Sequence, residues 1–162
     1  MGCPEVRLLS VVEQNRLRIS KNTPSKKKSE MGQFFTPVTI AKFMAGLFKY
    51  DSFKGSCHLL DPGAGIGSLS CAFLDRCVSE KFSFKDFNLS AFELDESLYS
   101  EMKASFSYYS SLFPLSYEIK GGDFIEKATD MIHKGYTKEF THVIMNPPYK
   151  KIGSGTNHRY LL

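Results

Sequence analysis

Apolar positions along the 162-residue chain follow two spacings that alternate from one end to the other. Apolar residues three or four positions apart predict amphipathic helices, and short continuous apolar runs predict buried strands. The predicted helices are residues 5–19, residues 37–50, the segment in which Leu69, Phe73 and Cys77 share one face, residues 97–113, and a last segment that ends near Gly135. The predicted strands are residues 57–61, 89–93, 115–119 and 140–145.

Strands that alternate with helices are typical of βαβ units and a parallel sheet. We therefore expect an α/β fold with a Rossmann-like sheet of about four parallel strands and flanking helices. The fourth predicted strand lies close to the last residue, and doubly wound sheets usually contain more strands. The pattern thus predicts an incomplete sheet, in which Val143, Ile144 and Met145 form an open apolar edge that favours aggregation or pairing with another chain.

Composition indicates an ordinary globular domain. Apolar residues make up 42% of the chain and charged residues 23%, which excludes wholesale disorder. No apolar run approaches the roughly 18 residues needed to span a bilayer. The four cysteines (Cys3, Cys57, Cys71 and Cys77) form no CxxC pair. We therefore expect a reduced, cytoplasmic protein without a disulfide framework, a zinc site or a membrane segment.

The net charge of +4 comes entirely from the first part of the chain. Residues 1–30 hold seven Lys or Arg against three Glu, and residues 31–162 hold fourteen charges of each sign. The excess is concentrated at Lys26, Lys27 and Lys28. A basic arm beside a neutral domain fits a polyanionic partner, and the alternative is a solvated linker.

Residues 61–67, Asp-Pro-Gly-Ala-Gly-Ile-Gly, join the first predicted strand to a helix. Glycines there let a ligand approach the backbone, whose N–H groups can bind it, and this turn is where doubly wound sheets bind nucleosides. The spacing matches neither the dinucleotide GxGxxG motif nor the P-loop. Asp61 suits a ligand with a cationic end, such as a methionine ammonium. The alternative is a tight turn without a ligand.

Acidic residues also lie at the ends of the next two predicted strands. Glu93 closes the second strand, where a carboxylate can accept both hydroxyls of a ribose. Asp123 and Phe124 follow the third strand, where they can bind the amine of an adenine and stack on its ring. The alternatives are a solvated charge at Glu93, a helix cap at Asp123 and a core side chain at Phe124.

The fourth predicted strand continues into the segment Asn146-Pro147-Pro148-Tyr149. Prolines are stiff and lack an N–H, so nearby carbonyls stay free to accept hydrogen bonds. The Asn146 side-chain oxygen and the Pro147 carbonyl can together accept both hydrogens of a planar NH₂ group, which frees its lone pair to meet an electrophile. Tyr149 can stack on the ring that carries the amine. The alternative is a turn that merely ends the strand.

Residues 32–37, Gly-Gln-Phe-Phe-Thr-Pro, precede the second predicted helix. We expect this helix to begin with Thr36 as its N-cap and Pro37 in its first position. Backbone N–H groups and a threonine hydroxyl at a helix N-terminus suit a carboxylate. Taken alone, the segment indicates a helix cap with two core phenylalanines.

Taken in order, the segments GQFFTP, DPGAGIG, FELD, GGDF and VIMNPPY resemble the gamma group of N6-adenine DNA methyltransferases from restriction–modification systems. The resemblance covers residues 31–150. It implies a methyltransferase sheet that binds S-adenosylmethionine and transfers its methyl group to N6 of an adenine flipped out of double-stranded DNA. It divides the chain into an N-terminal helix with a basic linker (residues 1–30) and a partial catalytic domain (residues 31–162) that lacks the target-recognition region.

The resemblance also implies a cofactor-binding set, which is Thr36, Asp61, Gly63, Gly65, Glu93, Asp123 and Phe124. In this set Thr36 would hold the methionine end of the cofactor, and Asp61 with the two glycines would line that pocket. Glu93 would take the ribose hydroxyls. Asp123 and Phe124 would contact the cofactor adenine.

The catalytic set implied by the resemblance is Asn146 and Pro147, which would orient the target amine, and Tyr149, which would stack on the flipped base. Members of the family continue well past this motif, so a second chain that supplies the rest of the sheet and the recognition domain is an expected partner. Two other functions stay open. One is methylation of a protein glutamine amide or an RNA base, and the other is a truncated cofactor-binding module without catalysis.

Overall fold

The computed structural model describes residues 5–26, 35–49, 55–135 and 140–147. Of the residues singled out above, several lie outside the described part of the chain: Cys3, Lys27, Lys28, residues 32–34, Pro148 and Tyr149. Within the described ranges, no helix is long and apolar enough to cross a membrane. The same ranges contain no cluster of three His, Cys, Asp or Glu side chains that could bind a metal ion.

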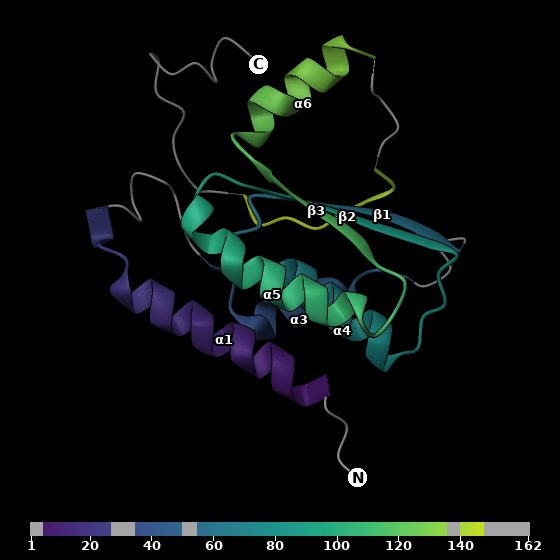
Figure 1. The fold of residues 1–162 in the computed structure, drawn as a ribbon, viewed down its shortest axis with the longest axis horizontal. Coiled ribbons are helices and arrows are strands. Elements are labelled where there is room, and N and C mark those ends of the chain that lie inside the picture. Colours follow the sequence, from purple (N-terminus) through teal and green to yellow (C-terminus); the bar gives the residue numbers. More distant parts are fainter. Residues whose placement is uncertain (1–4, 27–34, 50–54, 136–139, 148–162) are drawn as a thin grey trace.

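The described strands form one parallel sheet in the order β3-β2-β1-β4 (Figure 1). Their bounds are β1 Ser56–Pro62, β2 Asp86–Glu93, β3 Ser116–Gly121 and β4 His142–Val143. Each matches a predicted strand, and β4 is shorter than predicted although the Ile144 N–H still donates to the Leu60 carbonyl at 3.0 Å. The predicted α/β fold with four parallel strands is confirmed.

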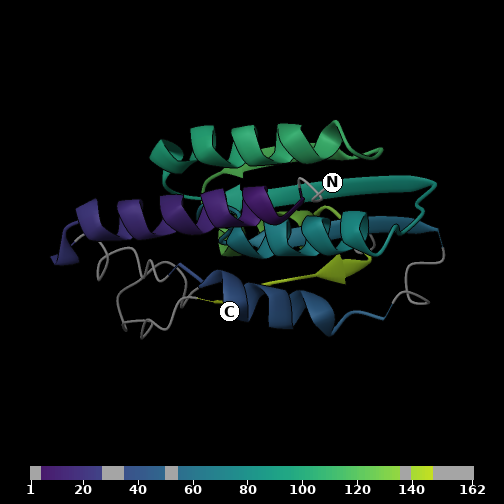
Figure 2. The same cartoon turned by 90° about the horizontal axis from the view of Figure 1, so that it is seen from below.

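Helices connect the strands and cover both faces of the sheet. Their bounds are α1 Glu5–Asn22, α3 Val38–Gly46, α4 Ser68–Ser79, the short 3-10 helix η2 Glu96–Leu98, α5 Tyr99–Ser110 and α6 Phe124–His133. Helices α3, α4 and α5 lie on one face and α6 lies on the other, while α1 forms a further layer outside α4 (Figures 1 and 2). The result is a layered α/β arrangement in which successive strand-to-helix turns meet at one edge of the sheet.

The hydrophobic core lies between the sheet and the layer of α3, α4 and α5. Aromatic rings contact one another across it, with Phe73 on α4 packed 5.0 Å from Phe48 and 6.0 Å from Phe87 on β2, measured between ring centroids. Leu9 and Val12 of α1 are 3% and 2% exposed and belong to the same core. The N-terminal helix therefore packs as part of this domain.

The start of α3 differs from the prediction. The helix begins at Val38, and Pro37 is its N-cap residue without a side-chain hydrogen bond, so the prediction that Thr36 caps this helix is wrong. The Val38 N–H instead donates to the Glu13 carboxylate on α1 at 3.1 Å. Because an acceptor from another helix satisfies this terminal N–H, the Thr36 hydroxyl is available for a different contact.

Candidate functional site

Four of the chemically interesting segments come together at the carboxyl edge of the sheet. The glycine turn follows β1, Glu93 ends β2, Asp123 follows β3 and Asn146 follows β4. Because all four strands are parallel, their carboxyl ends lie at the same edge, which is where open α/β sheets bind ligands. The sequence therefore folds so that its predicted site residues share one edge, apart from Tyr149, which lies outside the described residues.

The glycine turn is held by β2 and open on one side. The N–H groups of Gly63 and Ala64 both donate to the Phe92 carbonyl, at 2.9 and 2.8 Å. Gly63 and Gly65 have φ values of 81° and 60°, a backbone conformation that favours glycine. A Cβ on Gly65 would lie 3.0 Å from the Phe35 ring, whereas a Cβ on Gly63 would meet no atom within 4 Å. Space for a ligand against the backbone is thus available beside Gly63.

Glu93 lies beneath this turn and is 7% exposed. Its Oε2 accepts a hydrogen bond from the Gly65 N–H at 2.7 Å, and its Oε1 accepts one from the Asp95 N–H at 2.8 Å. Two backbone donors therefore fix both oxygens of the carboxylate at the tip of β2. The alternative of a solvated strand-end charge does not fit this burial.

Asp61 is a fully buried carboxyl group directly before the turn. Its Oδ2 accepts a hydrogen bond from the Ser70 hydroxyl at 2.5 Å, while its Oδ1 has no hydrogen-bond partner among the residues that the structure describes. Burial raises the pKa of Asp61 to about 7, with a further contribution from the charge of Glu93 and an opposing one from Ser70. The Ser68 hydroxyl, in the first turn of α4, is also buried without a partner within the described chain.

Unpaired buried polar atoms at a glycine turn indicate that the site is adapted to a polar ligand, because leaving them unpaired costs free energy. An acidic group here suits a cationic or hydrogen-bond-donating ligand. Together with the open space beside Gly63, the donor set fits a nucleoside that carries an amino acid, as S-adenosylmethionine does. Nothing in the sequence spacing indicated Ser70, because its contact with Asp61 arises only when β1 and α4 pack together.

Asp123 and Phe124 have clear structural contacts. The Asp123 Oδ1 accepts from the Ile125 N–H at 2.8 Å, so Asp123 is the N-cap of α6. The half-buried Phe124 ring packs edge-on against Phe92, with 5.1 Å between the centroids. The capping alternative for Asp123 is therefore realised, and contact of either residue with an adenine stays a prediction.

Thr36 and Asn146, which are 110 positions apart in the chain, are in direct contact. The Asn146 Nδ2 donates to the Thr36 Oγ1 at 3.1 Å. Thr36 is only 7% exposed, and Asn146 is partly buried at the end of β4. Because the amide nitrogen is used by Thr36, the Asn146 oxygen is the end of the side chain that is oriented to accept a hydrogen bond from another group.

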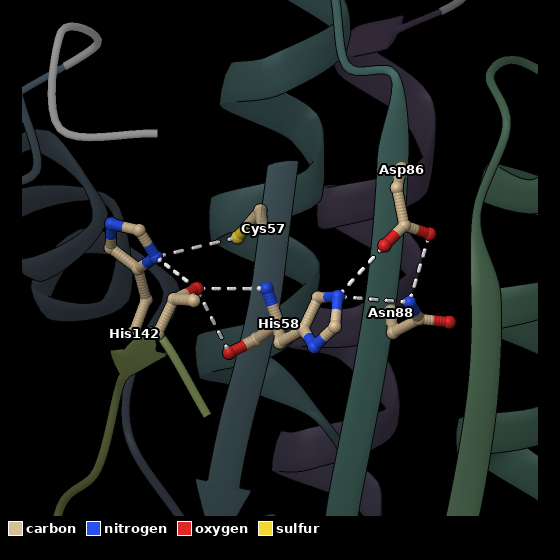
Figure 3. A network of polar contacts seen from close by, with 6 residues as sticks. Cys57, His58, Asp86, Asn88 and His142 are labelled. Atoms are coloured by element: carbon tan, nitrogen blue, oxygen red, sulfur yellow. Dashed lines mark hydrogen bonds and ion pairs between the residues drawn. The ribbon is translucent and has the colours of Figure 1, made fainter. Parts of the chain in front are cut away.

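The opposite edge of the sheet carries a different polar cluster (Figure 3). The His58 Nε2 lies 2.7 Å from the Asp86 Oδ2, and the Asn88 amide donates to the other Asp86 oxygen at 3.0 Å. Directly before β4, the Thr141 hydroxyl accepts from the His58 N–H at 2.9 Å and lies 2.7 Å from the His142 Nδ1. These contacts join β1, β2 and β4 at their amino ends, as expected for structural rather than ligand-binding histidines.

The curated proteins that this chain resembles are named Type II methyltransferases. It is 40% identical over 162 aligned residues to the Type II methyltransferase M.BsuBI of Bacillus subtilis, which covers 96% of this chain and 31% of the relative. It is 27% identical over 142 residues to the Type II methyltransferase M.PstI of Providencia stuartii, which covers 83% of this chain and 27% of the relative. The chain thus spans less than a third of the length of these relatives.

Solved structures confirm the fold. A protein of Pyrococcus horikoshii described as an RNA methyltransferase superposes with a TM-score of 0.54 at 21% identity, over 92% of this chain and 60% of that one. A protein of Klebsiella pneumoniae described as an O-methyltransferase gives 0.53 at 13% identity, over 91% and 55%. The model of the N-6 DNA methylase family matches residues 18–159, which include every segment that carried the sequence resemblance. The chain therefore belongs to the N-6 DNA methylase family.

Proposed function

We propose that this chain is the cofactor-binding and catalytic part of a restriction–modification enzyme that methylates N6 of adenine at a specific site in DNA. The observation that carries the proposal is the Asn146 side chain, held by Thr36 at the same edge of the sheet as the glycine turn and Glu93. A side-chain oxygen that can accept a hydrogen bond from an amine thus lies at the edge where a nucleoside cofactor would bind. Family membership and the named relatives support this reaction and S-adenosylmethionine as the cofactor.

In this proposal the residues of the glycine turn and of the β2 tip bind the cofactor, which supplies an activated methyl group when bound. Glu93 accepts the ribose hydroxyls with an already fixed carboxylate. Gly63 and Gly65 keep the backbone accessible, Asp61 is the acidic group for the methionine ammonium, and Thr36 faces the methionine end. Asp123 and Phe124 contact the adenine ring of the cofactor from the end of β3.

The acceptor amine is bound by Asn146 and Pro147. Their oxygens accept its two hydrogens, which removes the nitrogen lone pair from conjugation with the ring and turns it toward the methyl group. Tyr149 stacks on the target base, which must leave the duplex to reach the site. Transfer is then an in-line displacement that depends on positioning, without a covalent enzyme intermediate. As the nitrogen becomes cationic, the Asn146 and Pro147 oxygens stabilise the developing charge.

Further polypeptide is part of this proposal. A groove of about 280 Å³ lies beside β4 and is lined by Met44, Leu47, Phe48, Val143, Ile144 and Met145. Ile40 and Phe43 on α3, and Leu47 directly after it, are at least half exposed. Apolar surface of this kind marks a contact with other protein. We infer that additional strands and the DNA-recognition region pack here, because the relatives are more than three times as long as the part that matches.

Light scattering on the purified chain tests this contact. We expect association at micromolar concentration, reduced by Phe43→Lys, because the charge disfavours burial of the exposed α3 surface. A monodisperse wild-type chain would contradict it.

The basic leader, of which Lys26 is described and exposed, would add sequence-independent and salt-sensitive contacts to DNA. A cytoplasmic location also belongs to this proposal.

The reaction itself is tested with S-adenosylmethionine carrying a labelled methyl group. The protein that contains this chain is incubated in parallel with duplex DNA, RNA and bulk protein. We expect label only in DNA, recovered as N6-methyladenine after digestion to nucleosides and confined to one sequence. Label in RNA or at glutamine would replace the proposed acceptor, and cofactor binding without transfer to any of the three would support a non-catalytic module.

A further inference from the structure

Helix α3 depends on another helix for its N-terminal hydrogen bond. Its N-cap, Pro37, offers no side-chain acceptor. The Glu13 Oε2 on α1, 25 positions earlier, accepts from the Val38 N–H at 3.1 Å. A carboxylate at a helix N-terminus is favourable for both the unpaired N–H groups and the helix dipole. The cap of α3 is therefore supplied from α1.

The capping carboxylate is itself held in a fixed position. Arg16 donates to Glu13 through two bonds, from Nε to Oε2 at 2.8 Å and from Nη2 to Oε1 at 2.7 Å. Such paired contacts fix the geometry of a carboxylate as well as its charge. The hydrogen bond from Arg16 lowers the pKa of Glu13, against a smaller opposing effect of burial. Glu13 is thus ionised when it caps α3 at neutral pH.

A short, stiff segment joins this cap to the candidate acceptor site. Only Pro37 separates Val38 from Thr36, and Pro37 has φ −59°, the value to which its ring restricts it. Thr36 is branched at Cβ, so its side chain has few rotamers. Its Oγ1 accepts the Asn146 Nδ2, which orients the amide. A shift at the start of α3 would therefore move Thr36 and turn the Asn146 oxygen.

We propose that Glu13 is a positioning residue for the Thr36–Asn146 pair, so that α1 sets the geometry of the acceptor site. The proposal rests on the proposed function for its catalytic consequence, but its structural consequence is independent of any activity. Helix α1 is suited to this role because Leu9 and Val12 anchor it in the core.

The chain offers a matched control at Glu101. This carboxylate also ties α1 to a neighbouring helix, since Asn15 and Arg18 donate to it at 2.8 and 2.7 Å. The Glu101 and Glu13 side chains are nearly equally exposed, at 28% and 30%. However, Glu101 lies on α5, and within the described residues its hydrogen bonds are to α1 and not to α3. Loss of Glu101 therefore loosens α1 without removing the cap.

Nuclear magnetic resonance on the full chain supplies the structural test. In Glu13→Ala we expect faster hydrogen exchange at the Val38 amide and a shifted or broadened Asn146 side-chain NH₂ signal. Glu13→Gln keeps an acceptor oxygen and should largely restore both signals. Glu101→Ala should leave both unchanged. An unchanged Asn146 signal in Glu13→Ala, or an equal change in Glu101→Ala, would overturn the proposal.

The kinetic test uses the methyltransferase that contains this chain. Misplacement of the acceptor group should lower kcat roughly tenfold in Glu13→Ala, with KM for cofactor and DNA within about twofold of the wild type. A rise in KM for the cofactor with unchanged kcat would contradict a role in orienting Asn146. If the wild type transfers no methyl group to adenine while the resonance changes occur, the proposed function fails and the positioning role stands.

Discussion

At the amino edge of the sheet, His58, Asp86 and Asn88 bind one another near the surface, whereas at the carboxyl edge Asp61 and Glu93 are buried beneath a glycine turn. The first group consists of the exposed Asp86 and the half-buried His58 and Asn88, whose side chains contact one another. In the second, two backbone N–H groups donate to Glu93, and Asp61 has one oxygen without a partner within the described ranges. The two edges of one sheet therefore use similar residue types under opposite conditions of solvation.

The difference predicts that the amino edge contributes mainly to stability and that the carboxyl edge binds a ligand. Surface ion pairs such as His58–Asp86 contribute at most about 1 kcal/mol, and they carry little strain. A buried unpaired carboxylate oxygen costs roughly 1–3 kcal/mol unless something else binds it. Substitutions at the carboxyl edge should therefore impair binding or catalysis more than folding, and substitutions at the amino edge should do the reverse.

The largest effect is expected from Asn146→Ala. Removal of a group that stabilises the transition state should lower kcat for adenine methylation by roughly 10²–10³-fold in the protein that contains this chain. Cofactor affinity, measured by calorimetry, should stay within about twofold. Glu93→Ala should show the converse, with weakened cofactor binding as its primary defect. Similar losses of cofactor affinity in both variants would contradict the division of roles.

A second large effect is expected from Gly65→Val. The Cβ of the new side chain would lie 3.0 Å from the Phe35 ring at a residue with φ 60°, so the turn would have to shift. We expect cofactor affinity to fall by roughly 10–100-fold, a loss of about 1.4–2.8 kcal/mol. The comparison is Gly55→Val before β1, where φ is 82° and a Cβ meets no atom within 4 Å. That variant should lose stability without losing affinity.

Asp61→Asn probes the cost of the buried carboxyl group through pH. The folded pKa of about 7 lies above the ordinary value of 3.8, so between these values the folded chain keeps a proton that the unfolded chain has lost. Stability contributed by the neutral acid is therefore lost as pH rises toward 7. Between pH 5 and pH 8 the wild type should lose about 2–3 kcal/mol more unfolding free energy than Asp61→Asn. Denaturant unfolding at several pH values measures this difference. The same pH dependence of the unfolding free energy in the wild type and in Asp61→Asn would contradict the prediction.

The sequence sufficed for features that depend on neighbouring residues. Apolar periodicity located the four strands that the structure describes, and the glycine turn and Glu93 correctly marked the ends of β1 and β2. Both Thr36 and Asn146 were singled out, yet nothing in either segment revealed that they touch. That contact depends on how α3 packs beside β4, which local patterns do not encode.

The same limit explains the error at α3. Thr36 and Pro37 form a favourable local start for a helix, but the acceptor on α1 satisfies the Val38 N–H and moves the helix start. The burial of Asp61 could not be predicted from the sequence either, because a carboxylate before a glycine turn can be solvated or enclosed. In this fold Ser70 and the sheet enclose Asp61 completely.

The smallest effect is expected at the amino edge, from His58→Ala. The His58 and Asp86 side chains are 38% and 49% exposed, so solvent and salt screen their interaction. We expect a loss of about 0.5 kcal/mol in unfolding free energy, smaller still in high salt, and no change in cofactor affinity. The backbone groups of residue 58 keep their hydrogen bonds with the Thr141 N–H and hydroxyl after the substitution, which holds β4 in register with β1. A clear loss of cofactor affinity in this variant would show that the two edges are coupled, which would invalidate the contrast between them.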